Sequence, residues 1–249
     1  MELTLIEPAG RSVLFVCPAH GRLTLAGICY RQLADMRDVL RRRGVDAQVV
    51  VVSNDENLEL AADNGFETLI WENWIGGRLN EGYSYAAREG YDYVCAVGND
   101  SWLHPDRFRW LPDRESMLCT RNYTTVLADG SSQEWLKLAY PGGVGSRVIP
   151  IHWLERVNYR PLHEQQMSGC DTETLMAICR HVERAPNLVY TDLHPYEVVG
   201  FQSETQVTDW RRYSEMYLHE RQQAFYGLQD YFPRELVEDV RDFYAAVAA

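Results

Sequence analysis

A glycine and two polar residues near the middle of the chain directly follow an apolar run, and the polar pair could bind a ligand. Tyr93–Val97 is typical of a buried parallel strand, and Gly98, Asn99 and Asp100 come next. Polar groups at the carboxyl end of such a strand lie where open α/β sheets bind ligands. Asp100 could therefore hold a hard cation, and that cation a diphosphate. A simple Asx turn that closes the strand is the alternative interpretation.

A second acidic group lies where a later helix begins. Cys170–Val182 has helical spacing, and Asp171 and Glu173 fall in its first turn. A carboxylate within hydrogen-bond reach of a substrate hydroxyl can act as a general base. Asp171 is the first candidate for this role and Glu173 is the substitute, whereas plain capping of the helix is the alternative interpretation of Asp171.

The elements that must position these groups alternate between strand and helix over the first 105 residues. Apolar, β-branched runs predict the strands, and amphipathic spacing predicts the helices. The expected strands are Ser12–Cys17, Ala47–Val52, Thr68–Trp71 and Tyr93–Val97, and the expected helices are Leu25–Arg43, Asn57–Asn64 and Leu79–Glu89. This order predicts a parallel sheet covered by helices.

The pattern changes after Pro112. Thr120–Leu127 and Gln133–Tyr140 are β-like runs joined through the turn Ala128–Ser131, which predicts a hairpin. The later expected elements are a strand at Arg147–Ile151, a short helix at His152–Val157 and C-terminal helices at Val207–Tyr226 and Glu235–Val247. No repeat or linker interrupts the chain, so we expect one continuous domain.

Composition narrows the class of protein. With 46% hydrophobic and 24% charged residues, the chain of 249 residues is typical of a globular protein. No apolar run approaches the roughly 18 residues that span a bilayer, and no signal peptide is evident, so we expect a cytoplasmic protein. The six cysteines are scattered without a CxxC pair, which favours reduced thiols over a zinc site. A net charge of -12 argues against sequence-independent binding of nucleic acid, although a local group of arginines leaves a basic groove possible.

The order of these motifs resembles the GT-A fold glycosyltransferases, particularly the large inverting family that includes many small bacterial and phage enzymes. The resemblance covers about residues 12–200. It depends on Val16–Arg22, Val49–Asp55, Leu79–Gly82, Gly98–Ser101, Gly142–Ile149 and Gly169–Leu175, taken in that order. Val16–Arg22 looks like the family's first strand with its Pro-x-x-x-Arg turn, and Gly98–Ser101 occupies the place of its acidic metal motif.

The resemblance implies an α/β fold of the GT-A (Rossmann-like) type. Its mostly parallel sheet is flanked by helices, with a small antiparallel β-hairpin on the acceptor side and helices at the C-terminus. Residues 1–249 would form a single domain, with a nucleotide-sugar-binding half over about 1–110. An acceptor-binding half would follow over about 111–200, and the C-terminal helices over about 205–249.

The resemblance also implies roles for individual residues. The donor-binding residues would be Pro18, His20, Arg22, Asp55, Arg78, Asn80, Asn99 and Asp100. Asp100 and His194 would bind a metal ion, with Asp192 as an alternative to His194. An imidazole ligand weakly favours Mn²⁺ over Mg²⁺. Asp171 or Glu173 would be the catalytic base, which implies inversion at the anomeric carbon.

The function that follows is metal-dependent transfer of a hexose from a nucleotide-sugar, most often a UDP-sugar in this family, to a hydroxyl group. The acceptor could be a glycan, a small molecule or a hydroxymethylated base in phage DNA. A sugar-phosphate nucleotidyltransferase and a non-catalytic nucleotide- or sugar-binding protein are the alternatives. The oligomeric state stays open.

Overall fold

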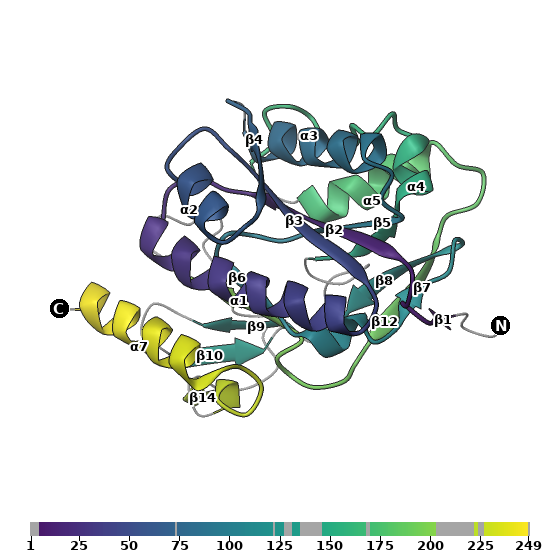
Figure 1. Ribbon diagram of the computed structural model, residues 1–249. Helices are drawn as coiled ribbons and strands as arrows, with labels where there is room; N and C mark the ends of the chain where they lie inside the picture. The colour runs from purple at the N-terminus through teal and green to yellow at the C-terminus, as the bar shows by residue number, and fades with distance from the viewer. Residues whose placement is uncertain are drawn as a thin grey trace.

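The computed structural model has a seven-stranded sheet with helices on both faces (Figure 1). It describes residues 5–72, 74–121, 123–126, 131–134, 146–167, 170–202, 222–223 and 227–248. The strand order is β12 (Asn187–Thr191), β8 (Ser116–Thr120), β11 (Val148–Pro150), β5 (Tyr93–Ala96), β2 (Ser12–Pro18), β3 (Asp46–Ser53) and β4 (Glu67–Ile70). β11 runs antiparallel to both of its neighbours, and the other strands are parallel to one another. The α/β fold class expected from the sequence is confirmed.

Two groups of helices cover this sheet. The helices α1 (Leu23–Arg42) and α2 (Asn57–Asp63) lie on one face, and α3 (Ile75–Arg88), α4 (Ile151–Glu155) and α5 (Cys170–Arg180) lie on the other (Figure 1). Side chains of a strand alternate between the two faces. In β2, Val13 and Phe15 therefore pack toward α1, while Leu14 and Val16 pack toward α3. Both faces are buried, which explains why the strands read as continuous apolar runs.

A second sheet lies on the far side of α1. Its order is β14 (Gln222–Gln223), β10 (Ser131–Glu134), β9 (Tyr123–Val126), β13 (Val198–Phe201) and β6 (Ser101–Leu103). Helix α7 (Arg234–Ala248) packs beside it and beside α1 (Figure 1). Trp102 and Phe201 form the centre of this second core, with ring centroids 4.7 Å apart. The buried Gln32 of α1 bonds both backbone groups of Leu103 and so fixes β6 to the helix.

Small elements complete the fold. A two-stranded sheet pairs β1 (Leu5–Ile6) with β7 (Leu111–Pro112), and the 3₁₀ helix η1 (Pro105–Phe108) joins β6 to β7. All six cysteines are free. None of the helices in the described ranges is long and apolar enough to cross a membrane.

Several expected elements need correction. The helix expected at Leu79–Glu89 begins at Ile75, so Arg78 lies within α3 rather than in a preceding loop. The run Thr120–Leu127 is not one strand, because it divides at Arg121 into the end of β8 and all of β9, which belong to different sheets. Both halves are buried, so the sequence shows no change of pattern at the division.

The expected hairpin exists in part. β9 and β10 pair antiparallel, but β10 begins at Ser131, inside the segment expected to form the turn. Residues 135–140 of the second expected strand lie outside the described residues. The expected helix Val207–Tyr226 also lies outside them, except for Gln222–Gln223, which form the strand β14 instead. The expected helix Glu235–Val247 falls within α7.

Candidate active site

The loops that follow β2 and β3 are joined by the carboxylate of Asp55. Its Oδ2 accepts a hydrogen bond from the backbone N–H of Gly21 at 2.7 Å, and its Oδ1 accepts from the Ser53 hydroxyl at 2.7 Å. Asn57 donates to Oδ1 from its backbone at 3.0 Å and from its side chain at 2.7 Å. The exposed ring of His20 lies 3.4 Å from Oδ2. Asp55 therefore fixes one corner of the carboxyl edge of the sheet.

The environment of Asp55 favours its ionised form. Burial alone would raise its pKa, but the hydrogen bonds from Gly21, Asn57 and Ser53 outweigh burial and lower the pKa to about 2. The side chain of Asp55 is 17% exposed, so water screens these hydrogen bonds only in part. A fixed negative charge at this point can accept hydrogen bonds from the hydroxyl or amide groups of a ligand.

Arg22 and Asp100 form an ion pair between the ends of β2 and β5. One guanidinium nitrogen of Arg22 donates to Oδ2 of Asp100, and both side chains are mostly buried. Arg22 immediately precedes α1 and has a left-handed backbone, with φ 55° and ψ 38°. This conformation is costly for a residue with a side chain and is concentrated at functional sites. The ion pair places a cation and an anion where the sequence predicted donor binding.

Two buried asparagines connect these groups. The side-chain nitrogen of Asn57 donates to the carbonyl of Gly21 at 3.0 Å, and that of Asn99 approaches the same carbonyl at 3.3 Å. Asn99 also lies 3.4 Å from Oδ1 of Asn57, which in turn accepts from the Tyr30 hydroxyl at 3.1 Å. Gly21 has a φ of 56°, a conformation that glycine adopts without strain. The ends of β2, β3 and β5 are thus held in one network.

Arg78 and Asn80 bond to the protein backbone and its neighbours. Arg78 is 5% exposed and donates to the carbonyl of Ala19 and, at 2.6 Å, to Oδ1 of Asn54. Asn80 is fully buried, and its amide bonds both backbone groups of Leu162. Arg78 lies at the site and supports the loops after β2 and β3. Asn80 instead fixes the segment around Leu162 to α3.

The candidate metal ligands do not come together. β13 pairs antiparallel with β6, with Val198 opposite Leu103, so the loop before β13 lies at the Leu103 end of β6. Asp100 lies at the opposite end of β6, where its carbonyl accepts from the backbone N–H of Phe201. His194 instead stacks on the ring of Tyr231, with centroids 4.4 Å apart. The structure therefore separates His194 from Asp100.

His194 occupies an aromatic cluster in the uncharged form. Its ring meets that of His104 edge to face, with centroids 4.3 Å apart. Burial, followed by the neighbouring His104, lowers the pKa of His194 to about 4. Its loop is held by the fully buried carboxylate of Glu197, which accepts from the hydroxyls of Thr191 and Thr120 and from the backbone of Leu193.

The chemistry of Asp100 fits a cation that is shared with a substrate. Across the described ranges, no three His, Cys, Asp or Glu residues converge as a protein-built metal cage. A divalent ion that binds a nucleotide usually takes one or two carboxylates and completes its shell with phosphate oxygens and water. Asp100 provides one such carboxylate, with Ser101 and Arg22 bonded to it.

The two candidate bases have different surroundings. Glu173 forms an exposed ion pair with Arg180 at 2.6 Å along the surface of α5. Asp171 is only partly exposed, and burial raises its pKa, while Arg147 and Arg107 act in the opposite direction. Arg147 is 2% exposed and donates to the backbone carbonyl of Asp171, which fixes the start of α5 to the segment before β11. Of the two candidates, Asp171 thus lies near buried arginines, whereas Glu173 is paired with an arginine at the surface.

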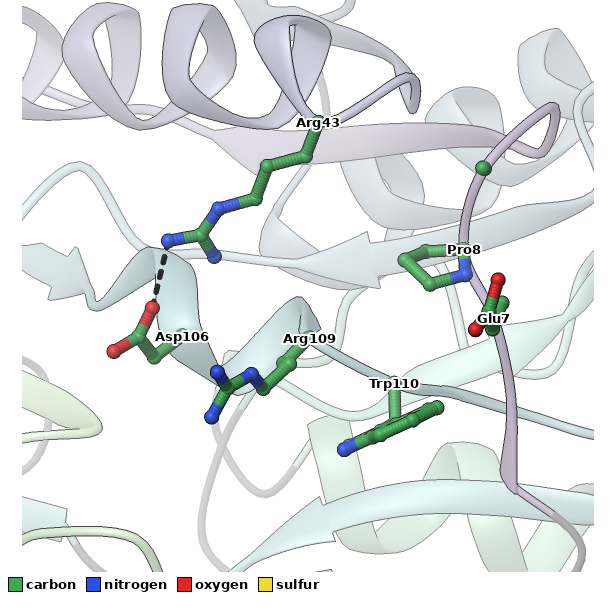
Figure 2. Close-up of a pocket in the computed structure, with 7 residues that line it drawn as sticks. Glu7, Pro8, Arg43, Asp106, Arg109 and Trp110 are labelled. Carbon is green, nitrogen blue, oxygen red and sulfur yellow. Dashed lines mark hydrogen bonds and ion pairs between the residues drawn. The ribbon is translucent and has the colours of Figure 1, made fainter.

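A separate pocket lies away from this edge. It has a volume of about 350 Å³ and is lined by Glu7, Pro8, Ala9, Arg43, Asp106, Arg109 and Trp110 (Figure 2). Arg43 follows the C-terminal end of α1 and pairs with Asp106 at 2.7 Å. Because α1 begins at the carboxyl edge of the sheet, its C-terminal end marks the opposite edge. This pocket is therefore not part of the site around Asp55 and Asp100.

The fold can be compared with known structures. A Drosophila β1,4-galactosyltransferase 7 variant in complex with manganese, UDP-Gal and xylobiose is 12% identical, with a TM-score of 0.53 over 82% of this chain and 74% of that chain. S. aureus TarS 1–349 in complex with UDP-GlcNAc is 12% identical, with a TM-score of 0.56 over 79% of this chain and 60% of that chain. The same fragment in complex with UDP gives a TM-score of 0.52 at 12% identity, over 77% of this chain and 61% of that chain.

These similarities define the class of fold. No protein-family model and no curated protein sequence matches the chain. The chain spans about three fifths of the TarS fragment. Its fold is that of the GT-A-like glycosyltransferases, as the sequence motifs predicted.

Some residues of the site were not singled out from the sequence. Asn57 lies in the polar run Ser53–Asn57 directly after β3, and this position was a usable signal. Arg107 belongs to the local group of arginines that left a basic groove open in the sequence, whereas Arg147 gave no comparable signal. The burial of Arg147 near Asp171 depends on the pairing of β11 with β5, which brings distant segments together.

Proposed function

We propose that this protein transfers a sugar from a nucleoside diphosphate sugar, most simply a UDP-sugar, to a hydroxyl acceptor with inversion at the anomeric carbon. The observation that carries the proposal is the arrangement of Asp55, the Arg22–Asp100 pair and Asp171 along one edge of a GT-A-like sheet. Solved structures with this fold contain UDP-GlcNAc, UDP or UDP-Gal, which supports the choice of donor.

The donor half would bind the nucleotide without large rearrangement. Asp55 is ionised and lies beside His20, so it can accept a hydrogen bond from the ribose or the base. Helix α1 begins directly after Arg22 and has no acidic residue in its first turn. The N-terminus of a helix favours anions, so this end of α1 together with Arg22 suits a diphosphate.

Asp100 would hold a divalent ion, Mn²⁺ or Mg²⁺, delivered with the donor. Such an ion neutralises negative charge on a departing diphosphate. In the protein without ligand, Arg22 pairs with Asp100. Once the metal ion binds Asp100 in place of Arg22, the guanidinium group can turn to the diphosphate. We assign no ligand role to His194, which lies at the other end of β6.

Asp171 would accept the proton of the acceptor hydroxyl. Its raised pKa brings it closer to the range in which a carboxylate exchanges protons with an alcohol during attack. One base opposite a departing diphosphate corresponds to a single displacement, which inverts the anomeric carbon. The acceptor is a glycan, a small molecule or a hydroxymethylated base in phage DNA, and the net charge of -12 favours the first two.

The test is donor turnover with purified protein. UDP-glucose, UDP-galactose and UDP-GlcNAc are incubated with MnCl₂ or with EDTA, and release of UDP is measured with and without simple glycoside acceptors. The proposal is supported if the rate of UDP release is lost in Asp100→Ala and reduced in Asp171→Asn. Release of pyrophosphate from UTP and a sugar phosphate would instead identify a nucleotidyltransferase. Absence of both, with retained binding of UDP, would identify a non-catalytic binding protein.

A further inference from the structure

One arginine beside the candidate base is buried without a strong hydrogen-bond acceptor among the described residues. Arg107 of η1 is 1% exposed, and all three of its guanidinium nitrogens lack a partner in the structure that the described residues form. It lies beside the thiol of Cys95, and sulfur is a weak acceptor. A buried charge that is neither paired nor hydrogen-bonded is strongly unfavourable. Binding of an anion would stabilise the guanidinium group of Arg107.

A second buried arginine lies next to the first. Arg147 is 2% exposed and directly precedes β11, where Val148 pairs with Cys95 of β5. Both guanidinium groups act on the same acidic side chain, that of Asp171, and on the thiol of Cys119. Among the described residues, Arg107 therefore lies close to a second arginine and to one carboxylate, with which none of its three guanidinium nitrogens forms a hydrogen bond.

This cluster lies near the edge of the sheet where ligands bind. Cys95 and Cys119 are near the carboxyl ends of β5 and β8, and open α/β sheets bind ligands at that edge. Asp171 is partly exposed, whereas the two arginines are buried behind it. A substrate hydroxyl that reaches Asp171 therefore brings the neighbouring part of the same substrate toward the arginines.

We propose that Arg107 and Arg147 form a binding site for a phosphate or carboxylate group carried by the substrate, next to the reacting hydroxyl. The planar fork of an arginine matches both groups in two parallel hydrogen bonds. The proposal rests on the proposed function for its location beside the base, and it names the acceptor as the source of the anion. The donor sugar, as a uronic acid, is the other source of the same chemistry.

The first experiment measures binding of the anion alone. Thermal unfolding of the whole protein is followed with sodium phosphate and sodium glucuronate, against sodium chloride at matched ionic strength, with UDP present to fill the donor site. We expect both anions to raise the unfolding temperature of the wild type by about 2–4 °C. If phosphate and glucuronate act no differently from chloride, the proposal is overturned, whether or not UDP itself stabilises the protein.

Two variants locate the response. Arg107→Met keeps an unbranched apolar stem and removes the guanidinium group with its charge, so the response to phosphate should disappear while the response to UDP remains. Loss of a buried unpaired charge should also raise the unfolding temperature without ligand, whereas a structural arginine would lower it. If Arg107→Met does not fold, Arg107→Lys decides, with an expected loss of about tenfold in phosphate affinity because the fork is gone. An unchanged phosphate response in either folded variant would overturn the proposal.

The matched control is Arg109→Met. Arg109 lies two residues further on, is exposed and lines the separate pocket in Figure 2. Its replacement should leave the phosphate response intact. If Arg109→Met removes the response, phosphate binds in that other pocket and the assignment to Arg107 is wrong.

A final comparison identifies the source of the anion. Transfer to glucose 6-phosphate is compared with transfer to glucose, and binding of UDP-glucuronate with binding of UDP-glucose, in the wild type and in Arg107→Met. A selective loss of about tenfold for glucose 6-phosphate supports the acceptor as the source. A selective loss of UDP-glucuronate binding shows that the anion belongs to the donor sugar. That result refutes the assignment to the acceptor and retains the anion site. Equal effects on charged and neutral substrates would overturn the substrate role altogether.

Discussion

Replacement of Asp55 by Asn should remove a pH-dependent part of the stability of the fold. The pKa of Asp55 falls from its ordinary 3.8 to about 2 because hydrogen bonds from Gly21, Asn57 and Ser53 favour the carboxylate. That difference corresponds to about 2 kcal/mol at neutral pH. Because the pKa is depressed in the folded chain, this stabilisation is present above about pH 4 and is lost as the pH falls toward about 2.

Urea unfolding of the wild type and Asp55→Asn at several pH values tests this reasoning. The difference in the free energy of unfolding should be largest at pH 7, almost as large at about pH 4, and reduced by roughly half at about pH 3. Asp63→Asn is the matched control, because Asp63 is an exposed carboxylate of the neighbouring α2. A difference between wild type and Asp55→Asn that stays constant from pH 6 to pH 3 would refute the account of Asp55.

Three further changes probe the site and its support. Asp171→Asn should lower transfer by roughly 100-fold, while donor affinity measured by calorimetry is unchanged. In the wild type, the rate of transfer should fall as the pH drops through the pKa of Asp171, which is raised above its ordinary 3.8. A rate that stays constant at acid pH would contradict this role. Gly82→Ala should destabilise the fold by about 1–3 kcal/mol in the same urea assay, because the new Cβ would lie 2.1 Å from Cγ1 of Val16. Gly27→Ala is the control. Nothing lies within 4 Å of the Cβ added there, so this change in α1 should stabilise the fold by up to about 1 kcal/mol. Glu197→Gln should lower stability by about 1–3 kcal/mol, since an amide group would face donors that now meet a buried carboxylate, and an unchanged urea midpoint would count against that anchor.

The first half of the fold follows from local patterns. Val13–Cys17 and Val49–Val52 are buried on both faces of a parallel sheet, so their apolar runs identify them directly. Helix α1 shows clear spacing because one side packs on this sheet and another on the second core. These signals depend only on neighbours in the sequence, and they are sufficient to place Asp55 and Asp100 at strand ends.

The second half depends on contacts that no local pattern reports. β13 is parallel to β9 and antiparallel to β6, so its place is set by two segments that are about 75 and about 97 residues earlier in the chain. The position of His194 at the far end of β6 from Asp100 follows from that register, and no local pattern indicates it. The burial of Arg107 beside Asp171 likewise results from tertiary packing, which overrides the usual exposure of arginine.

The hydrogen bonds among Gly21, Asn57, Asn99 and Asp55 would have a consequence for the kinetics of the proposed donor binding. Because these loops are already cross-linked to one another in the free protein, a nucleotide that docks here meets a rigid receptor and loses little free energy to ordering of the chain. Amide hydrogen exchange at Gly21 and Asn57 should then be slow before UDP is added and change little afterwards. Discrimination among nucleotides would arise in their dissociation rates, since association with a preformed surface varies little from one nucleotide to the next.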